Sequence, residues 1–300
     1  MNNKTEYRSL EFAVKDCFGG DVVVERTAHV GGGDINSAAC LYLSNGEAVF
    51  VKSNKIENRD LFAAEEQGLN AIAATNTIKT PYLIGRGVDS GRGIAFLMME
   101  MLRGGQRTPD FWETFGRELA ALHCADPSRF LRGGSFGFHS DNYIGMTPQR
   151  NQEQDTWIEF FRSCRLKPQI DCAAHYFDMT MRRKLDRLLD RLDDLLEEPK
   201  RPSLLHGDLW SGNYIQGPDG KAWLIDPAVY VGHYEADLAM TELFGGFSER
   251  FYSGYREIIP MEAGYKDRRD LYNLYHLLNH LNLFGAAYLP SVMTVVENYL

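Results

Sequence analysis

Hydrophobic residues in the first hundred positions recur mainly with the period of β-strands. Alternating apolar and polar runs, separated by glycines or by Asn45-Gly46, predict strands joined by hairpins. The expected strands cover residues 22–30, 38–43, 48–52, 82–87 and 94–99. One helix is expected over residues 59–74, because apolar positions repeat there at the spacing of one helical face, as in Leu61, Leu69 and Ile72.

Beyond Gly104-Gly105 the period changes to that of helices. Thr108, a residue type that caps helices, and Pro109, which suits the first helical position, predict a helix that starts there. Further helices are expected over 157–164, 179–196 and the chain after 226, with a Gly- and Ser-rich loop over 127–152 and short strands over 203–226. The pattern therefore indicates an α+β protein with a β-rich part over 1–103 and a mostly helical part over 104–300.

The composition is that of a soluble globular protein. Of 300 residues, 44% are hydrophobic and 24% are charged, and the net charge is −9. Lys and Arg are not clustered as phosphate binding requires, so we expect no nucleic-acid partner. The uncharged segment 271–296 contains Asn, His and Pro and is too polar for lipid, so we expect no membrane partner. Five scattered cysteines without zinc-site spacing favour reduced thiols and a cytoplasmic location.

Oxygen-bearing side chains follow a short apolar strand near residue 205. His206-Gly207-Asp208 comes at the end of that strand, and Asn213 lies five residues beyond Asp208. Two more strand-like runs, joined by the turn at 217–220, predict a hairpin that starts after Asn213 and ends before Asp226. Because the two ends of a hairpin lie side by side, we expect Asp208, Asn213 and Asp226 to converge.

This set of side chains suits phosphoryl transfer. One carboxylate accepts the proton of the attacking hydroxyl, while an Asn and a second Asp bind magnesium, a hard cation that prefers oxygen ligands. The pattern H-x-D-x-x-x-x-N, with a further Asp 13 residues after the Asn, has the spacing of the kinase catalytic signature. We therefore expect Asp208 to be the base, and Asn213 and Asp226 to hold Mg²⁺ beside ATP.

Two upstream features would complete an ATP site. Lys52 ends the run VFVK, and Glu65 on the apolar face of the next helix is its expected partner, because an unpaired charge there would be costly. The periodicity leaves the neighbouring Glu66 open as the partner instead. Gly31-Gly32-Gly33 lies between two expected strands, where glycines let backbone N–H groups approach phosphate oxygens. The same glycines also fit an ordinary hairpin turn.

Several stretches make the chain resemble the fructosamine/ketosamine kinase family, a branch of the protein-kinase-like fold related to aminoglycoside and choline kinases. The matching stretches are GGGDIN, VFVKSN, TNTIKTP, LMME, NYIGMTPQRN, RLKPQ, HGDLWSGN, DPAVYVGHYEADLAM and LYHLLNHLNLFG. The resemblance implies a bilobal fold, with a small β-rich N-lobe and a larger helical C-lobe. It also implies ATP- and Mg²⁺-dependent phosphorylation of a sugar hydroxyl on a glycated amine, which is a deglycation repair reaction.

The resemblance assigns further residues. Lys52 and Glu65 would form the ion pair on the ATP side, and Met99 and Glu100 would lie at the hinge that holds adenine. On the acceptor side, Trp210 lies two residues after the expected base, and its indole offers a flat face to a sugar ring and an attraction to a cationic amine.

His280 lies on the uncharged C-terminal helix that, by the resemblance, walls the acceptor cleft, where its imidazole could hydrogen-bond a sugar hydroxyl. His280 and Trp210 could instead serve only to pack the core. We interpret Asp237, which opens a helix after the expected metal loop, as a structural acceptor for N–H groups of the catalytic loop.

Two other functions share this residue set. A pseudokinase would hold nucleotide without turnover, but such proteins usually lack one of the four residues Lys52, Asp208, Asn213 and Asp226. A kinase of another small amino-alcohol, aminoglycoside-like or choline-like, would carry all four. Gly207 replaces the Arg of the protein-kinase loop, and no A-P-E segment follows. We therefore expect the acceptor to be a small sugar-amine or a glycated lysine. We also expect the protein to be a monomer.

Two local patterns suggest other chemistry. Gly133 to Gly137 matches the G-x-S-x-G of serine hydrolases, but the strand and helix that such an elbow needs are not expected around it. His276 and His280 have a metal-compatible spacing, but no third ligand is evident. Neither pattern is expected to mark a catalytic site.

Overall fold

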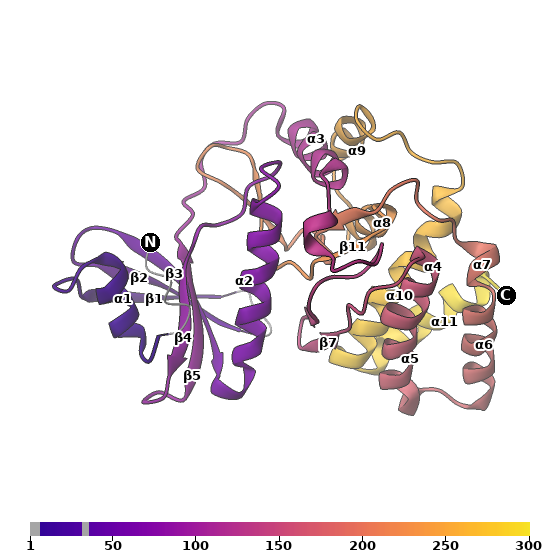
Figure 1. Ribbon diagram of the computed structural model, residues 1–300, viewed down its shortest axis with the longest axis horizontal. Helices are drawn as coiled ribbons and strands as arrows, with labels where there is room; N and C mark the ends of the chain where they lie inside the picture. Colours follow the sequence, from indigo (N-terminus) through magenta and orange to yellow (C-terminus); the bar gives the residue numbers. More distant parts are fainter. Residues whose placement is uncertain (1–6, 32–35) are drawn as a thin grey trace.

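The computed structural model describes residues 7–31 and 36–300, which form two lobes (Figure 1). The N-lobe is built on a five-stranded antiparallel sheet of order β1-β2-β3-β5-β4. Its strands are β1 Val24–Val30, β2 Ser37–Leu43, β3 Ala48–Lys55, β4 Leu83–Asp89 and β5 Ile94–Glu100. Each of the five predicted strands is therefore present, with β3 three residues longer than expected.

Two helices pack on opposite faces of this sheet, because side chains along a strand alternate between its faces. Phe96 and Met98 of β5 share a buried cluster with α1 (Leu10–Phe18), whereas Leu97 and Met99 share another with α2 (Arg59–Ala73). The sequence pattern predicted α2 but missed α1. The first helix has only 9 residues, so its three buried positions give too short a run to show a period.

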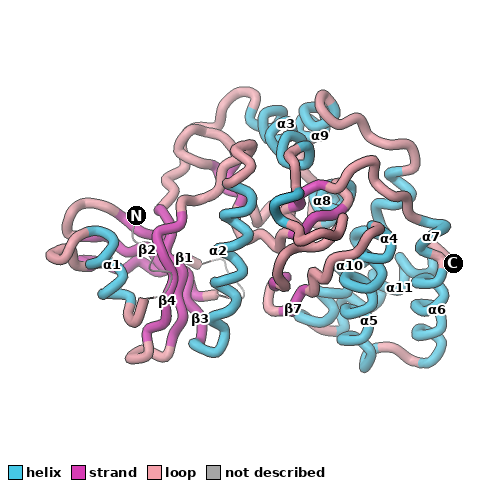
Figure 2. Tube along the Cα trace, viewed as in Figure 1, coloured by secondary structure: helices cyan, strands magenta, loops and turns pink. Residues whose placement is uncertain are grey.

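Helices dominate the C-lobe, as Figure 2 shows. Its α-helices are α3 Phe111–Cys124, α4 Trp157–Phe160, α5 Lys167–Cys172, α6 Met179–Asp190, α7 Leu192–Leu195, α8 Glu235–Leu243, α9 Glu249–Arg256, α10 Tyr265–Phe284 and α11 Leu289–Asn298. The π-helix Phe161–Leu166 joins α4 to α5, and 3-10 turns occupy Ser128–Phe130, Ala173–Tyr176 and Ala286–Tyr288. One further 3-10 turn, Ile56–Asn58, lies in the N-lobe between β3 and α2. Helix α10 runs through the core, with 12 of its 20 residues buried.

Three helix and loop predictions need correction. The helix expected to start near Thr108 begins at Phe111 with Asp110 at its N-cap, because a turn in which Phe111 N donates to Thr108 O precedes it. The helix expected over 179–196 is interrupted at Arg191 between α6 and α7. The loop expected over 127–152 contains a short hairpin of β6 Asn142–Ile144 and β7 Thr147–Gln149.

Two short strand pairs support the middle of the C-lobe. Strand β8 (Ser203–Leu205) pairs with β11 (Tyr230–Gly232), and β9 (Tyr214–Gln216) pairs with β10 (Ala222–Leu224). The β9–β10 hairpin was predicted from its turn, whereas β11 was not. Its partner β8 lies 25 residues earlier, so no local pattern indicates the pairing.

The two lobes are joined by the segment between β5 and α3, residues 101–110. We propose the division 1–103 and 104–300 within this segment. The segment is tied to the β9–β10 turn, since Gly105 N donates to Gly217 O at 3.0 Å. Among the described residues, no helix is long and apolar enough to cross a membrane.

Candidate active site

The loop 206–213 is held against the segment 226–229 by the pairing of β8 with β11. Ala228 N donates to His206 O at 2.9 Å, which continues that pairing into the loop. Gly207 has φ +82, and a Cβ there would collide with the carbonyl of Ala228. Only glycine therefore permits this close approach, which explains why it stands before Asp208.

Asp208 projects from this loop and is oriented by Asn213. The Nδ2 of Asn213 donates both to Asp208 O at 2.7 Å and to Asp208 Oδ2 at 3.0 Å. Burial raises the pKa of Asp208 to about 7, although the hydrogen bond from Asn213 acts in the opposite direction. The remaining carboxylate oxygen, Oδ1, is thus available to a proton donor near neutral pH.

Asn213 and Asp226 lie at the same end of the β9–β10 hairpin, as its turn predicted. Ile225 N donates to Asn213 O at 3.0 Å, just beyond the last pair of the ladder. Asp226 has φ +54, a left-handed conformation that Asp adopts more readily than most residues. Its Oδ1 forms an ion pair with Lys52 Nζ, which brings the two lobes together at the site.

Lys52 on β3 and Glu65 on α2 form the expected ion pair. Their Nζ and Oε1 atoms lie 2.6 Å apart, and both side chains are largely buried. Glu66, the alternative partner, turns away and pairs with Arg86 at 2.8 Å. The structure thus distinguishes two residues that periodicity alone could not.

The buried carboxylate of Asp237 holds the start of the loop 206–213 by hydrogen bonds to its backbone. Asp237 accepts from His206 N at 2.7 Å, from Gly207 N at 2.8 Å and from the ring of His123 at 3.2 Å. Burial alone would raise the pKa of Asp237, but these donors outweigh it and keep the pKa below its usual value. The interpretation of Asp237 as an acceptor for loop N–H groups is confirmed.

His206 ties the two halves of the site together, a role that the sequence did not reveal. Its Nε2 lies 2.9 Å from Ile225 O, and because a carbonyl only accepts, Nε2 carries the proton. Nδ1 is then free to accept from Asp208 N at 3.3 Å. Burial lowers the pKa of His206, so the ring stays neutral in this arrangement.

Of the expected nucleotide-binding residues, Gly31 follows β1, and Met99 and Glu100 are the last two residues of β5. Gly31 follows β1 and is exposed, whereas Gly32 and Gly33 lie outside the described residues. Met99 is buried on the α2 side of the sheet. Glu100 ends β5, and its N–H donates to Tyr82 O at 2.9 Å.

Trp210 and His280 both lie near the ring of Phe244, a residue that no sequence pattern indicated. The ring of Phe244 is 6.3 Å from that of Trp210 and 4.8 Å from that of His280. Trp210 is 38% exposed and also covers Gly212, where a Cβ would collide with the indole. The two predicted acceptor residues thus contact the same aromatic ring and form one aromatic surface with it.

The structure does not support a serine-hydrolase site at Gly133 to Gly137 or a metal site at His276 and His280. Ser135 lies in an irregular segment and is bonded through its N–H to Gln154 O, without a strand before it and a helix after it. His280 Nδ1 donates to His276 O at 2.8 Å, a helical contact that a shared metal ion would not require. Within residues 7–31 and 36–300, no group of three His, Cys, Asp or Glu side chains could hold a metal ion by itself.

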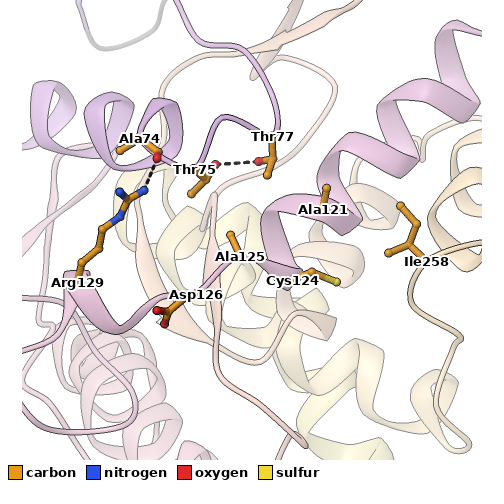
Figure 3. Close-up of a pocket in the computed structure, with 9 residues that line it drawn as sticks. All are labelled: Ala74, Thr75, Thr77, Ala121, Cys124, Ala125, Asp126, Arg129 and Ile258. Atoms are coloured by element: carbon orange, nitrogen blue, oxygen red, sulfur yellow. Dashed lines mark hydrogen bonds between the residues drawn. The ribbon is translucent and has the colours of Figure 1, made fainter.

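A cavity of about 570 Å³ lies elsewhere, where the ends of α2 and α3 meet (Figure 3). It is lined by Ala74, Thr75, Thr77, Ala121, Cys124, Ala125, Asp126, Arg129 and Ile258. Arg129 donates to Ala74 O across it, and Thr75 bonds to Thr77 at 2.8 Å. None of the predicted site residues lines this cavity.

Known proteins resemble this chain over its full length. The family model described as fructosamine kinase matches residues 8–300. A "Probable ketoamine kinase" of Synechocystis sp. is 39% identical, with 100% of this chain and 99% of the relative covered. A chloroplastic protein-ribulosamine 3-kinase of Oryza sativa subsp. indica is 41% identical, with 90% of this chain and 78% of the relative covered.

A solved structure agrees with these sequence matches. The crystal structure of a "Putative fructosamine-3-kinase" from Haemophilus somnus 129PT has a TM-score of 0.86 and 28% identity, and the similarity covers 99% of this chain and 98% of that chain. The predicted bilobal, protein-kinase-like α+β fold is thereby confirmed, as is the predicted family. The chain belongs to the fructosamine kinase family.

Proposed function

We propose that this protein transfers the γ-phosphoryl group of ATP to a sugar hydroxyl of a ketosamine, a fructosamine- or ribulosamine-type glycated amine, in a deglycation repair reaction. One observation carries the proposal. Asp208, Asn213 and Asp226 converge in the C-lobe, and Lys52 of the N-lobe reaches Asp226. Membership of the fructosamine kinase family supports the choice of acceptor.

Asp208 acts as the general base of this reaction. Asn213 occupies its Oδ2, so Oδ1 accepts the proton of the acceptor hydroxyl. The hydroxyl oxygen forms a bond to the γ-phosphorus, the bond from that phosphorus to the β–γ bridging oxygen breaks, and ADP leaves. The proton remains on Asp208 until it passes to solvent.

The residues present fit a magnesium ion. The Nδ2–H group of Asn213 donates to Asp208, so the Oδ1 atom of Asn213 is left to act as a metal ligand. Asp226 supplies a carboxylate that is 42% exposed. Magnesium takes few protein ligands and relies on phosphates and water for the rest. Asn213 and Asp226 would hold Mg²⁺, which would neutralise charge on the phosphates of ATP.

The N-lobe binds the nucleotide. Lys52, held by Glu65, presents its ammonium to the phosphates, and we assign Gly31, Gly32 and Gly33 to phosphate binding. Met99 and Glu100 lead into the hinge beside adenine. Because the N–H of Glu100 is already bonded to Tyr82 O, the backbone donor for adenine comes from the residues that follow it.

Replacing Glu65 with Gln tests the nucleotide side. Because Glu65→Gln removes a charge-assisted contact to Lys52, we expect kcat/KM for ATP to fall roughly 10- to 100-fold, with the thermal midpoint nearly unchanged. Glu66→Gln, which breaks only the contact to Arg86, is the matched control and should lose less than about threefold. If the two variants ranked in the opposite order, Glu65 would not be the functional partner of Lys52.

The aromatic surface of Trp210, Phe244 and His280 binds the acceptor. His280 donates Nδ1–H to His276 O, and burial lowers its pKa, so the ring is neutral and Nε2 can accept from a sugar hydroxyl. The half-exposed indole of Trp210 offers a face to the sugar ring and to a cationic amine.

Truncating this surface should separate acceptor binding from ATP binding. We expect Trp210→Ala to raise KM for a fructosamine by roughly tenfold while KM for ATP stays within about twofold, because the ring lies on the acceptor side only. His280→Ala should lose activity on the sugar-amine with ATP affinity retained. Met179→Ala, which removes another exposed apolar side chain, is the control. Parallel losses of stability and of both affinities would show that Trp210 and His280 only pack.

We extend the proposal to the oligomeric state and the location of the protein. The protein acts as a monomer, because one chain supplies both the nucleotide and the acceptor residues. It acts in the cytoplasm, in line with the five free cysteines, and on a small sugar-amine or a glycated lysine.

A further inference from the structure

His276 carries a buried polar atom that has no partner. The residue is 4% exposed on α10, and within the described part of the chain its Nδ1 has no hydrogen bond. Buried polar atoms in folded proteins are nearly always paired, so an unpaired one beside the expected base calls for an explanation. A ligand that supplies the missing bond is one such explanation.

The unpaired nitrogen faces the base. Nδ1 of His276 lies 3.8 Å from Oδ1 of Asp208, which is too far for a direct hydrogen bond. Asp208 Oδ1 is the carboxylate oxygen that Asn213 leaves unoccupied. Within the described residues, two polar atoms without a hydrogen bond therefore lie 3.8 Å apart, close enough for neighbouring hydroxyls of one acceptor to reach both.

Neighbours of His276 hold helix α10 in place. Tyr275 is buried and donates to Gln149 Oε1 at 2.7 Å, and Asn279 accepts from Gln169 at 3.3 Å, which fixes the rotation of the helix. One turn further along, His280 bonds to the carbonyl of His276. Burial lowers the pKa of His276 to about 3, so a neutral ring meets any ligand.

We propose that Nδ1 of His276 hydrogen-bonds the hydroxyl next to the one that Asp208 deprotonates, so that the site selects acceptors with a vicinal diol. This inference rests on the proposed function and narrows its substrate class. A polyol sugar satisfies both atoms at once. An amino-alcohol with a single hydroxyl leaves the imidazole nitrogen unpaired, and sites built to bond a hydroxyl discriminate strongly against ligands that lack it.

The test combines variants of His276 with deoxy substrates. His276→Phe keeps a ring but removes the nitrogen, and His276→Asn returns a polar atom at a similar distance from the backbone. Each protein is assayed with an N-fructosyl amine and with analogues that each lack one hydroxyl. The measured quantities are kcat/KM for the acceptor, KM for ATP and the thermal midpoint.

We expect wild type to lose roughly 10- to 100-fold in kcat/KM on one analogue that still carries the reacting hydroxyl. His276→Phe should lose about as much kcat/KM on the full substrate, and its kcat/KM should be no lower on that analogue than on the full substrate. His276→Asn should recover part of the loss on the full substrate. KM for ATP should stay unchanged in both variants.

Two results would overturn the inference while leaving the proposed function intact. In one, His276→Phe lowers kcat/KM relative to wild type by the same factor on the full substrate and on every analogue. The ring would then act only through Asp208 or through packing. In the other, His276→Phe retains full activity on the full substrate. Failure of wild type to phosphorylate the N-fructosyl amine at all would instead contradict the proposed function, and the inference with it.

Discussion

Replacing Asp208 with Asn lowers kcat by on the order of 10²-fold or more, while KM for ATP stays near the wild-type value. The amide has the shape of the carboxylate and can still accept the hydrogen bond from Asn213, but it cannot take a proton from the acceptor. The measurement is steady-state ADP release with saturating ATP and a ketosamine, alongside the thermal midpoint. Asp60→Asn, an equally conservative change at an exposed position on α2, is the control.

The expected loss is confined to turnover because Asp208 makes no contact that the variant breaks. A thermal midpoint close to wild type together with a large fall in kcat would identify a role in proton transfer. Near-normal turnover of Asp208→Asn would remove this residue from the mechanism, and another base would have to be sought.

Removing the carboxylate of Asp226 should abolish magnesium-dependent ATP binding as well as turnover. In Asp226→Ala the site loses a charged metal ligand and Lys52 loses one of its two anionic partners. We expect kcat/KM for ATP to fall by on the order of 10²-fold or more. The measurement is ATP affinity by calorimetry over a series of Mg²⁺ concentrations.

A second variant separates charge from backbone conformation. Position 226 has φ +54, where alanine is strained by about 1 kcal/mol or more, whereas Asn tolerates it. Asp226→Asn should therefore lose Mg²⁺-dependent affinity for ATP while its thermal midpoint stays near the wild-type value. Asp226→Ala should lose that affinity and also have a lower thermal midpoint. Wild-type use of Mg·ATP by Asp226→Asn would show that the end of the β9–β10 hairpin is not the metal site.

The positions of the candidate site residues could be predicted because local patterns determine where they lie. A turn at 217–220 forces a hairpin, and a hairpin places Asn213 beside the residues that follow β10. Likewise, the strand that contains Lys52 and the apolar face that carries Glu65 were both visible as periodic patterns. The five-stranded sheet was predicted for the same reason, since short alternating runs were separated by turn residues.

Residues whose roles depend on distant contacts could not be predicted. The pairing of β11 with β8, the contacts of Phe244 with Trp210 and His280, and the approach of His276 to Asp208 all join parts of the chain that are far apart in sequence.

A coupled assay of ADP formation tests most directly whether the acceptor is a ketosamine. Purified protein with Mg²⁺ and ATP is offered fructosamines, ribulosamines, an aminoglycoside and choline in turn, and the acceptors are analysed for phosphate. We predict Mg²⁺-dependent ADP formation that matches phosphorylation of the ketosamines, at a kcat/KM well above that of the other two acceptors. Turnover only with the aminoglycoside or choline, or ATP binding without phosphorylation of any acceptor, would contradict it.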